Sequence, residues 1–151
     1  MSPRFSPPKD KQELLGLLTG DDSPFSELRD VLFFAAAIGY REQRRKQLDG
    51  RGDAIRWETM LNRYGTEELM DMIAVMDQPE DRELLSTSRQ SDRVSILEEY
   101  ANGGLEVIQE RIHLSGAVPL QSVFVQLIQS YLSEGDVKRT ESGLADKVLN
   151  L

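Results

Sequence analysis

The sequence predicts a mainly α-helical fold, a compact single-domain bundle of about six helices. Apolar residues recur at three- and four-residue spacing along most of the chain, which is the period of an amphipathic helix. Alternation is confined to Ile55, Trp57 and Thr59, so we expect at most one short strand or hairpin, near residues 54–60. The chain of 151 residues is also long enough to bury one core without disulfides or metals.

The first residues predict a loose arm followed by a short helix. Residues 1–9 contain three prolines and are expected to form a flexible arm. Asp10 is a suitable N-cap for a helix over residues 10–18, which carries four leucines. The Gly- and Pro-containing run over residues 19–24 then indicates a turn.

A buried central helix is expected next. Ser26 is a good N-cap for a helix over residues 27–38, which is apolar nearly all round and therefore typical of the middle of a bundle. Gly39 is predicted to be the C-cap of this helix. The alternative is one uninterrupted helix to Leu48, since a glycine inside a helix costs only about 1 kcal/mol.

The second half of the chain predicts further helices separated by loops. Thr66 caps a helix to about Met76, and a short helical stretch follows over residues 79–85. A longer helix begins at Ser91 or Asp92 and is expected to break at Asn102-Gly103-Gly104.

The pattern resumes over residues 105–112, and Pro119 opens a last helix to Leu132. We therefore predict a single helical domain over residues 10–133, followed by a polar C-terminal tail over residues 134–151.

Charge and rare residue types exclude several kinds of chemistry. The chain has 18 Lys and Arg against 26 Asp and Glu, a formal net charge of −8, which disfavours nonspecific binding to nucleic acid. It has no cysteine and one histidine, which excludes disulfides, thiolate nucleophiles, iron–sulfur clusters and histidine-rich metal sites. We expect no cofactor and no bound metal.

The sequence also predicts a cytoplasmic protein. The N-terminus lacks the apolar run of a signal peptide. The most apolar stretch, residues 31–38, is too short to span a bilayer.

The segment over residues 40–56 is basic in an otherwise acidic chain. It carries six bases and three acids, a net charge of +3, whereas residues 66–100 carry ten acids and three bases, a net charge of −7. Arginine binds phosphates and carboxylates with two parallel hydrogen bonds, and aromatic residues flank the cluster. We predict a nucleic-acid or anion-binding face made of Tyr40, Arg41, Arg44, Arg45, Lys46, Arg51, Arg56 and Trp57.

Two alternatives to this face stay open. In the first, the bases are solvated or pair with the acidic block, within the chain or across a homodimer, and the protein is an interaction or regulatory module. In the second, carboxylates hold Mg²⁺ in an enzyme, since hard cations need only oxygen ligands. The carboxylates considered for such a site are Glu67, Asp71, Glu98 and Glu99.

The string around the expected helix break is a second candidate site. Asn and Gly tolerate unusual backbone angles, so a sharp kink between helices is one interpretation. The other is a backbone surface that binds a partner protein, formed by Tyr100, Asn102, Gly103 and Gly104.

Three strings resemble a small bacterial family. They are residues 25–40 together with Arg44-Arg45, residues 55–57, and residues 98–105 with the run Glu-Glu-Tyr-Ala-Asn-Gly-Gly-Leu. The chain is similar over about residues 12–132 to the Dnd-system-associated small proteins, which are encoded beside DNA phosphorothioation genes.

The resemblance implies a helical accessory protein of a DNA sulphur modification and restriction system that serves in defence, and it brings no catalytic residues. Sulphur insertion needs a cysteine desulfurase and an iron–sulfur protein, and a chain without cysteine can be neither. Our leading hypothesis is a non-enzymatic protein that binds other Dnd-system proteins. A second part of this hypothesis is that the protein also binds DNA through the basic segment.

Overall fold

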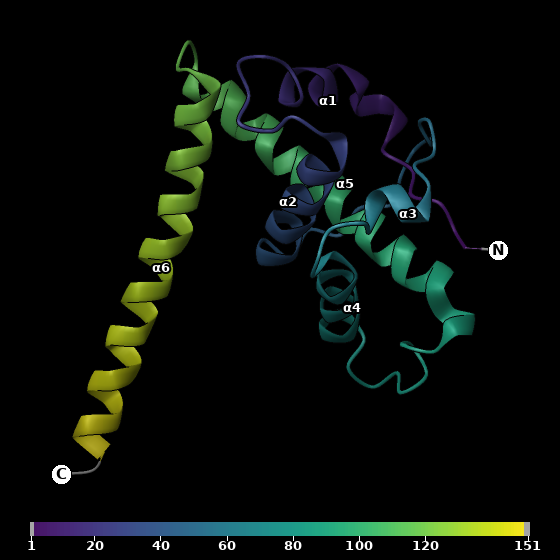
Figure 1. The fold of residues 1–151 in the computed structure, drawn as a ribbon. Coiled ribbons are helices and arrows are strands. Elements are labelled where there is room, and N and C mark those ends of the chain that lie inside the picture. The colour runs from purple at the N-terminus through teal and green to yellow at the C-terminus, as the bar shows by residue number, and fades with distance from the viewer. Residues whose placement is uncertain (1, 150–151) are drawn as a thin grey trace. The chain divides into compact units, whose positions relative to one another are not determined.

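The computed structural model describes residues 2–149, with side chains described as far as residue 135. Within that range the chain is mainly helical, as predicted, and the two 3-10 turns Lys9–Lys11 and Thr87–Arg89 are its other helical elements. The six α-helices (Figure 1) are α1 Gln12–Leu18, α2 Leu28–Arg41, α3 Trp57–Met60, α4 Thr66–Asp77, α5 Gln90–Ser115 and α6 Leu120–Leu149.

The chain divides into two compact units, Met1–Glu110 and Arg111–Leu151. The first unit contains α1 to α4 and most of α5, and the second contains the end of α5 and α6. The predicted boundaries of a single helical domain at residues 10 and 133 stay a prediction. In the described part of the chain we find no helix that is both long and apolar enough to cross a membrane.

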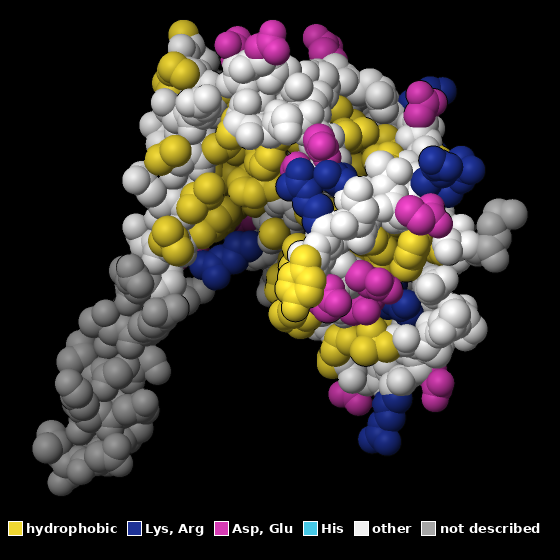
Figure 2. Space-filling view, in the orientation of Figure 1, with side chains coloured by type: hydrophobic (Ala, Val, Ile, Leu, Met, Phe, Trp, Pro, Cys, Tyr) yellow, Lys and Arg dark blue, Asp and Glu magenta, His cyan; other side chains and the backbone are white. Residues whose placement is uncertain are grey.

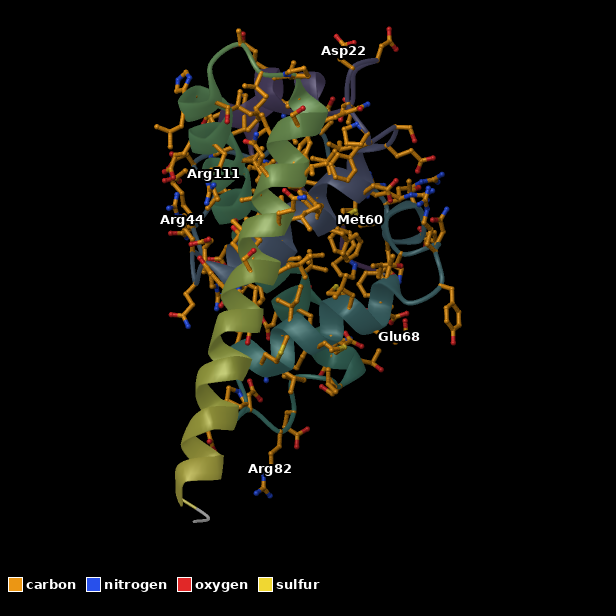
Figure 3. All side chains as sticks on the ribbon, turned by 90° about the vertical axis from the view of Figure 1, so that its left-hand side faces the viewer. Asp22, Arg44, Met60, Glu68, Arg82 and Arg111 are labelled. Atoms are coloured by element: carbon orange, nitrogen blue, oxygen red, sulfur yellow. The ribbon has the colours of Figure 1, made fainter. Side chains whose placement is uncertain are left out.

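The core of the first unit forms around α2. This helix is apolar nearly all round because it is buried nearly all round, as the sequence predicts. Val31 of α2 and Leu97 of α5 are among its most buried side chains, and Leu32 of α2 is also buried. Met60 of α3 is also fully buried and points into the same core (Figure 3).

The expected breaks at Gly39 and at Asn102-Gly103-Gly104 are both absent, because these glycines serve helix packing. Helix α2 runs through Gly39 to Arg41, and α5 runs without interruption from Gln90 to Ser115. A Cβ on Gly104 would lie 1.6 Å from the carbonyl oxygen of Ala35, and one on Gly39 would lie 2.0 Å from that of Tyr100. The glycines therefore allow direct backbone contact between α2 and α5.

Helix α2 ends at a different residue from the predicted C-cap. Gln43 has a φ of 54°, in the left-handed region, and its N–H donates to the carbonyl of Tyr40. The Arg44 N–H then donates to the carbonyl of Gly39 at 2.8 Å. This closing turn redirects the chain and begins the basic segment.

The proline-containing start of the chain is held in place, which differs from the expected flexible arm. Phe5 is 1% exposed and pairs with Ile55 through two backbone hydrogen bonds of 2.9 and 2.7 Å. A second isolated antiparallel bridge joins Pro8 to Arg51. The expected strand near residues 54–60 is reduced to the Ile55 bridge, because the chain turns into α3 at Trp57, whose ring packs 5.8 Å from that of Phe5.

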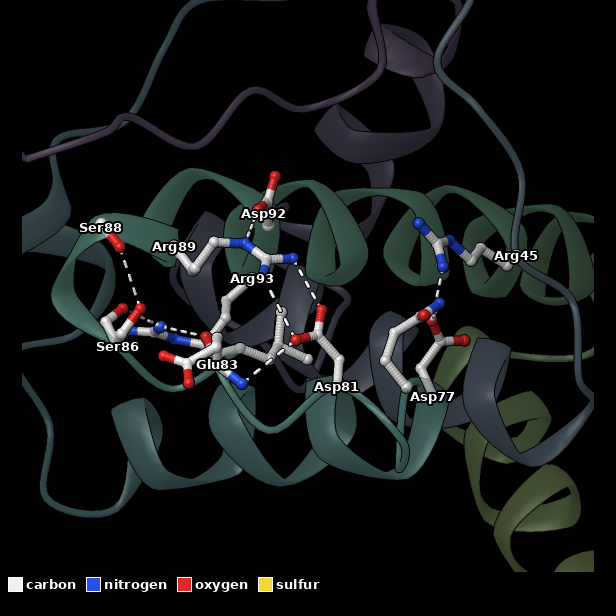
Figure 4. Close-up of polar contacts among 11 residues, drawn as sticks. Arg45, Asp77, Asp81, Glu83, Ser86, Ser88, Arg89, Asp92 and Arg93 are labelled. Atoms are coloured by element: carbon white, nitrogen blue, oxygen red, sulfur yellow. Dashed lines mark hydrogen bonds and ion pairs between the residues drawn. The ribbon is translucent and has the colours of Figure 1, made fainter.

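Residues 79–85 form turns and not the predicted short helix, and buried Arg93 binds the end of this stretch. The Arg93 guanidinium donates to the carbonyls of Leu84 (2.6 Å) and Ser86 (2.9 Å) (Figure 4), and it also lies 2.9 Å from the Asp71 carboxylate. Those carbonyls accept from a side chain of α5 and not from a helix of their own.

The last helix extends beyond its predicted end. Gly116 has a φ of +65° and, with Pro119 after it, forms the turn into α6. Helix α6 continues past Leu132 to Leu149. Of the predicted polar tail over residues 134–151, most side chains lie outside the described residues.

Candidate functional site

The basic segment lies along α5, and the carboxylates of α4 and α5 bind most of its cations. Its backbone is fixed first: the Lys46 N–H donates to the carbonyl of Glu99 at 3.0 Å. The Asn102 amide then donates to the carbonyls of Lys46 and Gln47, both at 3.2 Å. Arg44, Arg45 and Lys46 are thereby held beside the acidic residues of the two helices.

Arg44 and Lys46 share carboxylates of α5. Arg44 lies 2.8 Å from Glu110 and 3.6 Å from Glu106, and Lys46 lies 2.8 Å from Glu106. The hydrogen bond between Lys46 and Glu106 lowers the pKa of Glu106 and raises the pKa of Lys46. The hydrogen bond from Arg44 to Glu110 raises the pKa of Arg44. These pairs are partly exposed, so each contributes little to stability.

Arg45 binds carboxylates of two helices at once. It lies 2.5 Å from Asp77 at the end of α4 (Figure 4) and 3.0 Å from Glu99 of α5. The Tyr100 hydroxyl also donates to Asp77. Burial, with this hydrogen bond as the second cause, raises the pKa of Tyr100 to about 12. Asp77 therefore connects the basic segment to α5.

Arg51 lies beside the most buried carboxylate of this region. Glu98 is 6% exposed, accepts a hydrogen bond from the Ser6 N–H at 2.5 Å, and lies 3.1 Å from the Arg51 guanidinium. Burial raises the pKa of Glu98 and outweighs both of these partners, which lower it. Glu98 therefore joins the N-terminal segment to α5 at an electrostatic cost.

That cost predicts the effect of Glu98→Gln. A carboxyl whose pKa is raised by folding destabilises the folded state when it is ionised, and the penalty disappears as pH falls through the raised value. Glutamine can still accept from the Ser6 N–H. We expect the variant to be more stable than wild type at pH 7, with a difference that shrinks as pH falls toward the ordinary value of 4.5.

Urea unfolding of both proteins across this pH range measures the difference. A variant that is less stable than wild type at pH 7 would show instead that the ion pair with Arg51 outweighs burial.

The other predicted residues of the anion-binding face divide into two groups. Tyr40 packs edge-on against Tyr100 with ring centroids 5.6 Å apart, and Arg41 lies exposed in the last turn of α2. Arg56 and Trp57 lie apart from the α5 carboxylates and line a surface pocket of about 250 Å³ with Ser2, Arg4 and Glu58. Four of the eight residues therefore pair with carboxylates and two others line this pocket, and the anion-binding face itself stays a prediction.

The four predicted partner-binding residues are all buried in α5. A Cβ on Gly103 would lie 1.8 Å from the carbonyl oxygen of Arg44, and Gly104 faces Ala35 in the same way. The Asn102 carbonyl accepts a hydrogen bond from buried Lys11 at 2.6 Å. Because all four residues are buried, none of them presents an exposed group to which a partner protein could bind.

Three of the four carboxylates considered for a metal site are paired with arginines, and the fourth, Glu67, is exposed in the first turn of α4. Asp71 lies against Arg93, Glu98 against Arg51, and Glu99 against Arg45. Among the residues that the structure describes, no group of three or more metal-binding side chains comes together.

A different surface, on α4, is the one that sequence reasoning missed. Its buried side carries Met70, Ile73 and Ala74, but four further apolar residues point outward. Their exposed fractions are 36% for Leu69, 58% for Met72, 39% for Val75 and 45% for Met76. Figure 2 shows hydrophobic side chains on the exposed surface of α4, with Asp and Glu side chains beside them. We call these four residues the α4 face.

The sequence contained a signal for this face. In Leu-Met-Asp-Met-Ile-Ala-Val-Met-Asp, residues 69–77, apolar positions outnumber those that one helix face can hold. An excess of this kind indicates either a fully buried helix or an uncovered apolar side.

Comparison with known protein families shows to which family the chain belongs. A model of the family described as DNA sulphur modification system-associated protein 4 matches residues 4–146. The chain belongs to this family. Comparisons with curated proteins and with solved structures returned no match.

Membership of this DNA sulphur modification system-associated family confirms the resemblance seen in the sequence. The match also covers residues beyond the strings that carried the resemblance, including Arg4 and the first turns of α6. The geometry described above therefore belongs to a protein associated with a DNA sulphur modification system.

Proposed function

We propose that this protein is a non-enzymatic accessory of a bacterial DNA sulphur modification system, and that it acts in the cytoplasm by binding another protein of that system through the α4 face. The uncovered apolar side of α4 is the observation that supports the proposal. Exposed apolar patches on a folded protein commonly mark protein interaction sites. Two of the four residues are methionines, whose flexible side chains adapt well to a partner.

The charge around the α4 face indicates the chemistry of the partner. Glu67 and Glu68 lie exposed in the first turn of α4, and Glu68 points outward (Figure 3). Neither carboxylate has an ion pair among the described residues. A partner segment with apolar side chains flanked by Lys or Arg complements such a surface.

The same charges argue against a second copy of this chain as the occupant. In a two-fold dimer each patch meets its own counterpart, so two copies of the α4 face would bring Glu67 and Glu68 close to like charges. We therefore favour a different protein over the homodimer.

DNA binding through the basic segment has less support. Arg44, Arg45 and Lys46 already have carboxylate partners at 3.0 Å or less. A phosphate would have to displace those partners before it gained the same contacts. This pairing corresponds to the alternative in which the bases serve the protein itself.

Capture from cells that carry the whole modification system tests the proposal. We expect tagged wild-type protein to retain another protein of the system, and purified Met72→Glu to bind that protein roughly thirtyfold more weakly, about 2 kcal/mol, as expected for a central interface residue. Leu17→Glu is the matched control, because Leu17 is a 50% exposed apolar residue on α1.

Equal binding by the two variants would remove the α4 face as the site. Failure of the wild-type protein to retain any protein of the system would contradict the proposed function itself. Light scattering provides a third outcome, since a dimer that Met72→Glu dissociates would identify a second copy of the chain as the occupant.

A further inference from the structure

Two arginines from distant parts of the chain face each other beside the N-terminal bridge. Phe5 and Ile55 exchange both backbone hydrogen bonds in an antiparallel pair. In this register Arg4 and Arg56 are the next residues across from each other, beyond the isolated bridge, and both line the same pocket. Both side chains are exposed. This agrees with the alternation of side chains along an extended segment, because Arg4 directly precedes Phe5, which points inward.

This arrangement is unfavourable without an anion. Like charges directly opposite each other destabilise an antiparallel pair. Neither Arg4 nor Arg56 has a side-chain hydrogen bond or ion pair with any residue that the structure describes. They differ in this from Arg44, Arg45, Lys46 and Arg51, all of which have carboxylate partners.

An aromatic ring lies at the same place. Arg4, Arg56 and Trp57 line one open pocket of about 250 Å³. Phe5 packs against Trp57 with ring centroids 5.8 Å apart and supports the indole from the core side. The pocket therefore combines two unpaired guanidinium groups, which suit a phosphate, with an indole, on which a nucleobase can stack.

We propose that this pocket binds one nucleoside phosphate unit, either a free nucleotide or the phosphorylated end of a DNA strand. The phosphate lies between Arg4 and Arg56 and relieves their repulsion, and the base stacks on Trp57. Ser2 and Glu58, which also line the pocket, supply a hydroxyl donor and a carboxylate acceptor at its edge. The site is separate from the α4 face and does not depend on it.

The protein carries its own probe for this site. Trp57 is the only tryptophan of the chain, so its fluorescence reports on the pocket alone. We expect titration with dAMP at low salt to quench this fluorescence, with weaker binding of deoxyadenosine and of inorganic phosphate, both followed also by calorimetry. A 5′-phosphorylated oligodeoxynucleotide distinguishes the two sources of the ligand, because a strand end binds more tightly than dAMP only if the site accepts DNA.

Substitutions of the two pocket arginines, compared with a control arginine elsewhere, distinguish a loss of binding charge from a loss of folding. Arg4→Ala and Arg56→Ala are each expected to weaken dAMP binding about tenfold or more, and Arg82→Ala, which removes an exposed arginine without a partner among the described residues, is expected to leave it unchanged. Arg4→Glu places opposite charges across the pair, so it should raise the thermal midpoint while it abolishes binding.

Three results would overturn the proposal. The first is the absence of quenching and of binding heat with every probe at millimolar concentration. The second is equal affinity for dAMP and deoxyadenosine, which would mean that the arginines contribute nothing. The third is equal affinity for dAMP and inorganic phosphate, which would mean that the indole contributes nothing.

Discussion

Gly104→Ala is expected to destabilise the protein by about 3 kcal/mol or more, beyond the usual range for overpacking. The new methyl group would lie 1.6 Å from the carbonyl oxygen and 2.5 Å from the carbonyl carbon of Ala35. Both atoms belong to the backbone of α2, which cannot rotate away as a side chain could. The two helices must separate at the centre of the core, where Leu105 and Ala35 are fully buried.

Chemical denaturation measures this loss, which corresponds to a thermal midpoint lower by roughly 6–12 °C for a chain of this size. Gly39→Ala provides an independent check from α2, since its methyl group would lie 2.0 Å from the carbonyl oxygen of Tyr100. Gly16→Ala is the matched control in α1, where a Cβ would meet no atom within 4 Å apart from the neighbouring backbone of its own helix. That substitution should stabilise the protein by about 0.5–1 kcal/mol through helix propensity.

If Gly104→Ala and Gly16→Ala had the same small effect, α2 and α5 could not be in backbone contact. A selective loss at Gly104 and Gly39 would place the closest approach of the two helices at these residues.

The fold class could be predicted because periodicity is a local property. Helix α2 is apolar nearly all round, and the sequence alone therefore identified it as central. The same local reasoning misread Gly39 and the Asn102-Gly103-Gly104 string as helix ends. A glycine needed for a turn and a glycine needed for helix contact look alike in sequence, and only the neighbouring helix distinguishes them.

The candidate site was predicted less completely, because the tertiary structure determines which carboxylate each basic side chain pairs with. The sequence shows a basic segment and an acidic block, and Arg45 and Arg51 do pair with carboxylates of that block. Arg44 and Lys46 pair instead with Glu106 and Glu110, outside it. Facing positions such as Arg4 and Arg56 are 52 residues apart, so no local pattern could have joined them.

The second large effect is expected at Asn102, whose side chain is 1% exposed. Its carbonyl accepts from the Lys11 ammonium at 2.6 Å, and its amide donates to two backbone carbonyls of the basic segment. Asn102→Leu removes all three hydrogen bonds. It also leaves Lys11, which is 6% exposed, with only the Asp10 carboxylate at 3.6 Å.

We expect Asn102→Leu to cost about 2–4 kcal/mol, since a buried charge and two partly buried carbonyls lose their partner together. Urea unfolding at pH 7 measures this cost, and a loss below about 1 kcal/mol would mean that water satisfies the freed groups.

Lys11→Met determines how much of that cost belongs to the ammonium group. Methionine keeps most of the length of the lysine side chain without its charge, so the double variant Lys11→Met/Asn102→Leu no longer buries an unpaired cation. We expect the double variant to be more stable than the sum of the single effects predicts, with a coupling of about 0.5–3 kcal/mol. Additive effects would show that Asn102 acts through the carbonyls of Lys46 and Gln47 alone. The coupling therefore separates two functions of one side chain, since one ties the N-terminal segment to α5 and the other fixes the backbone of the basic segment.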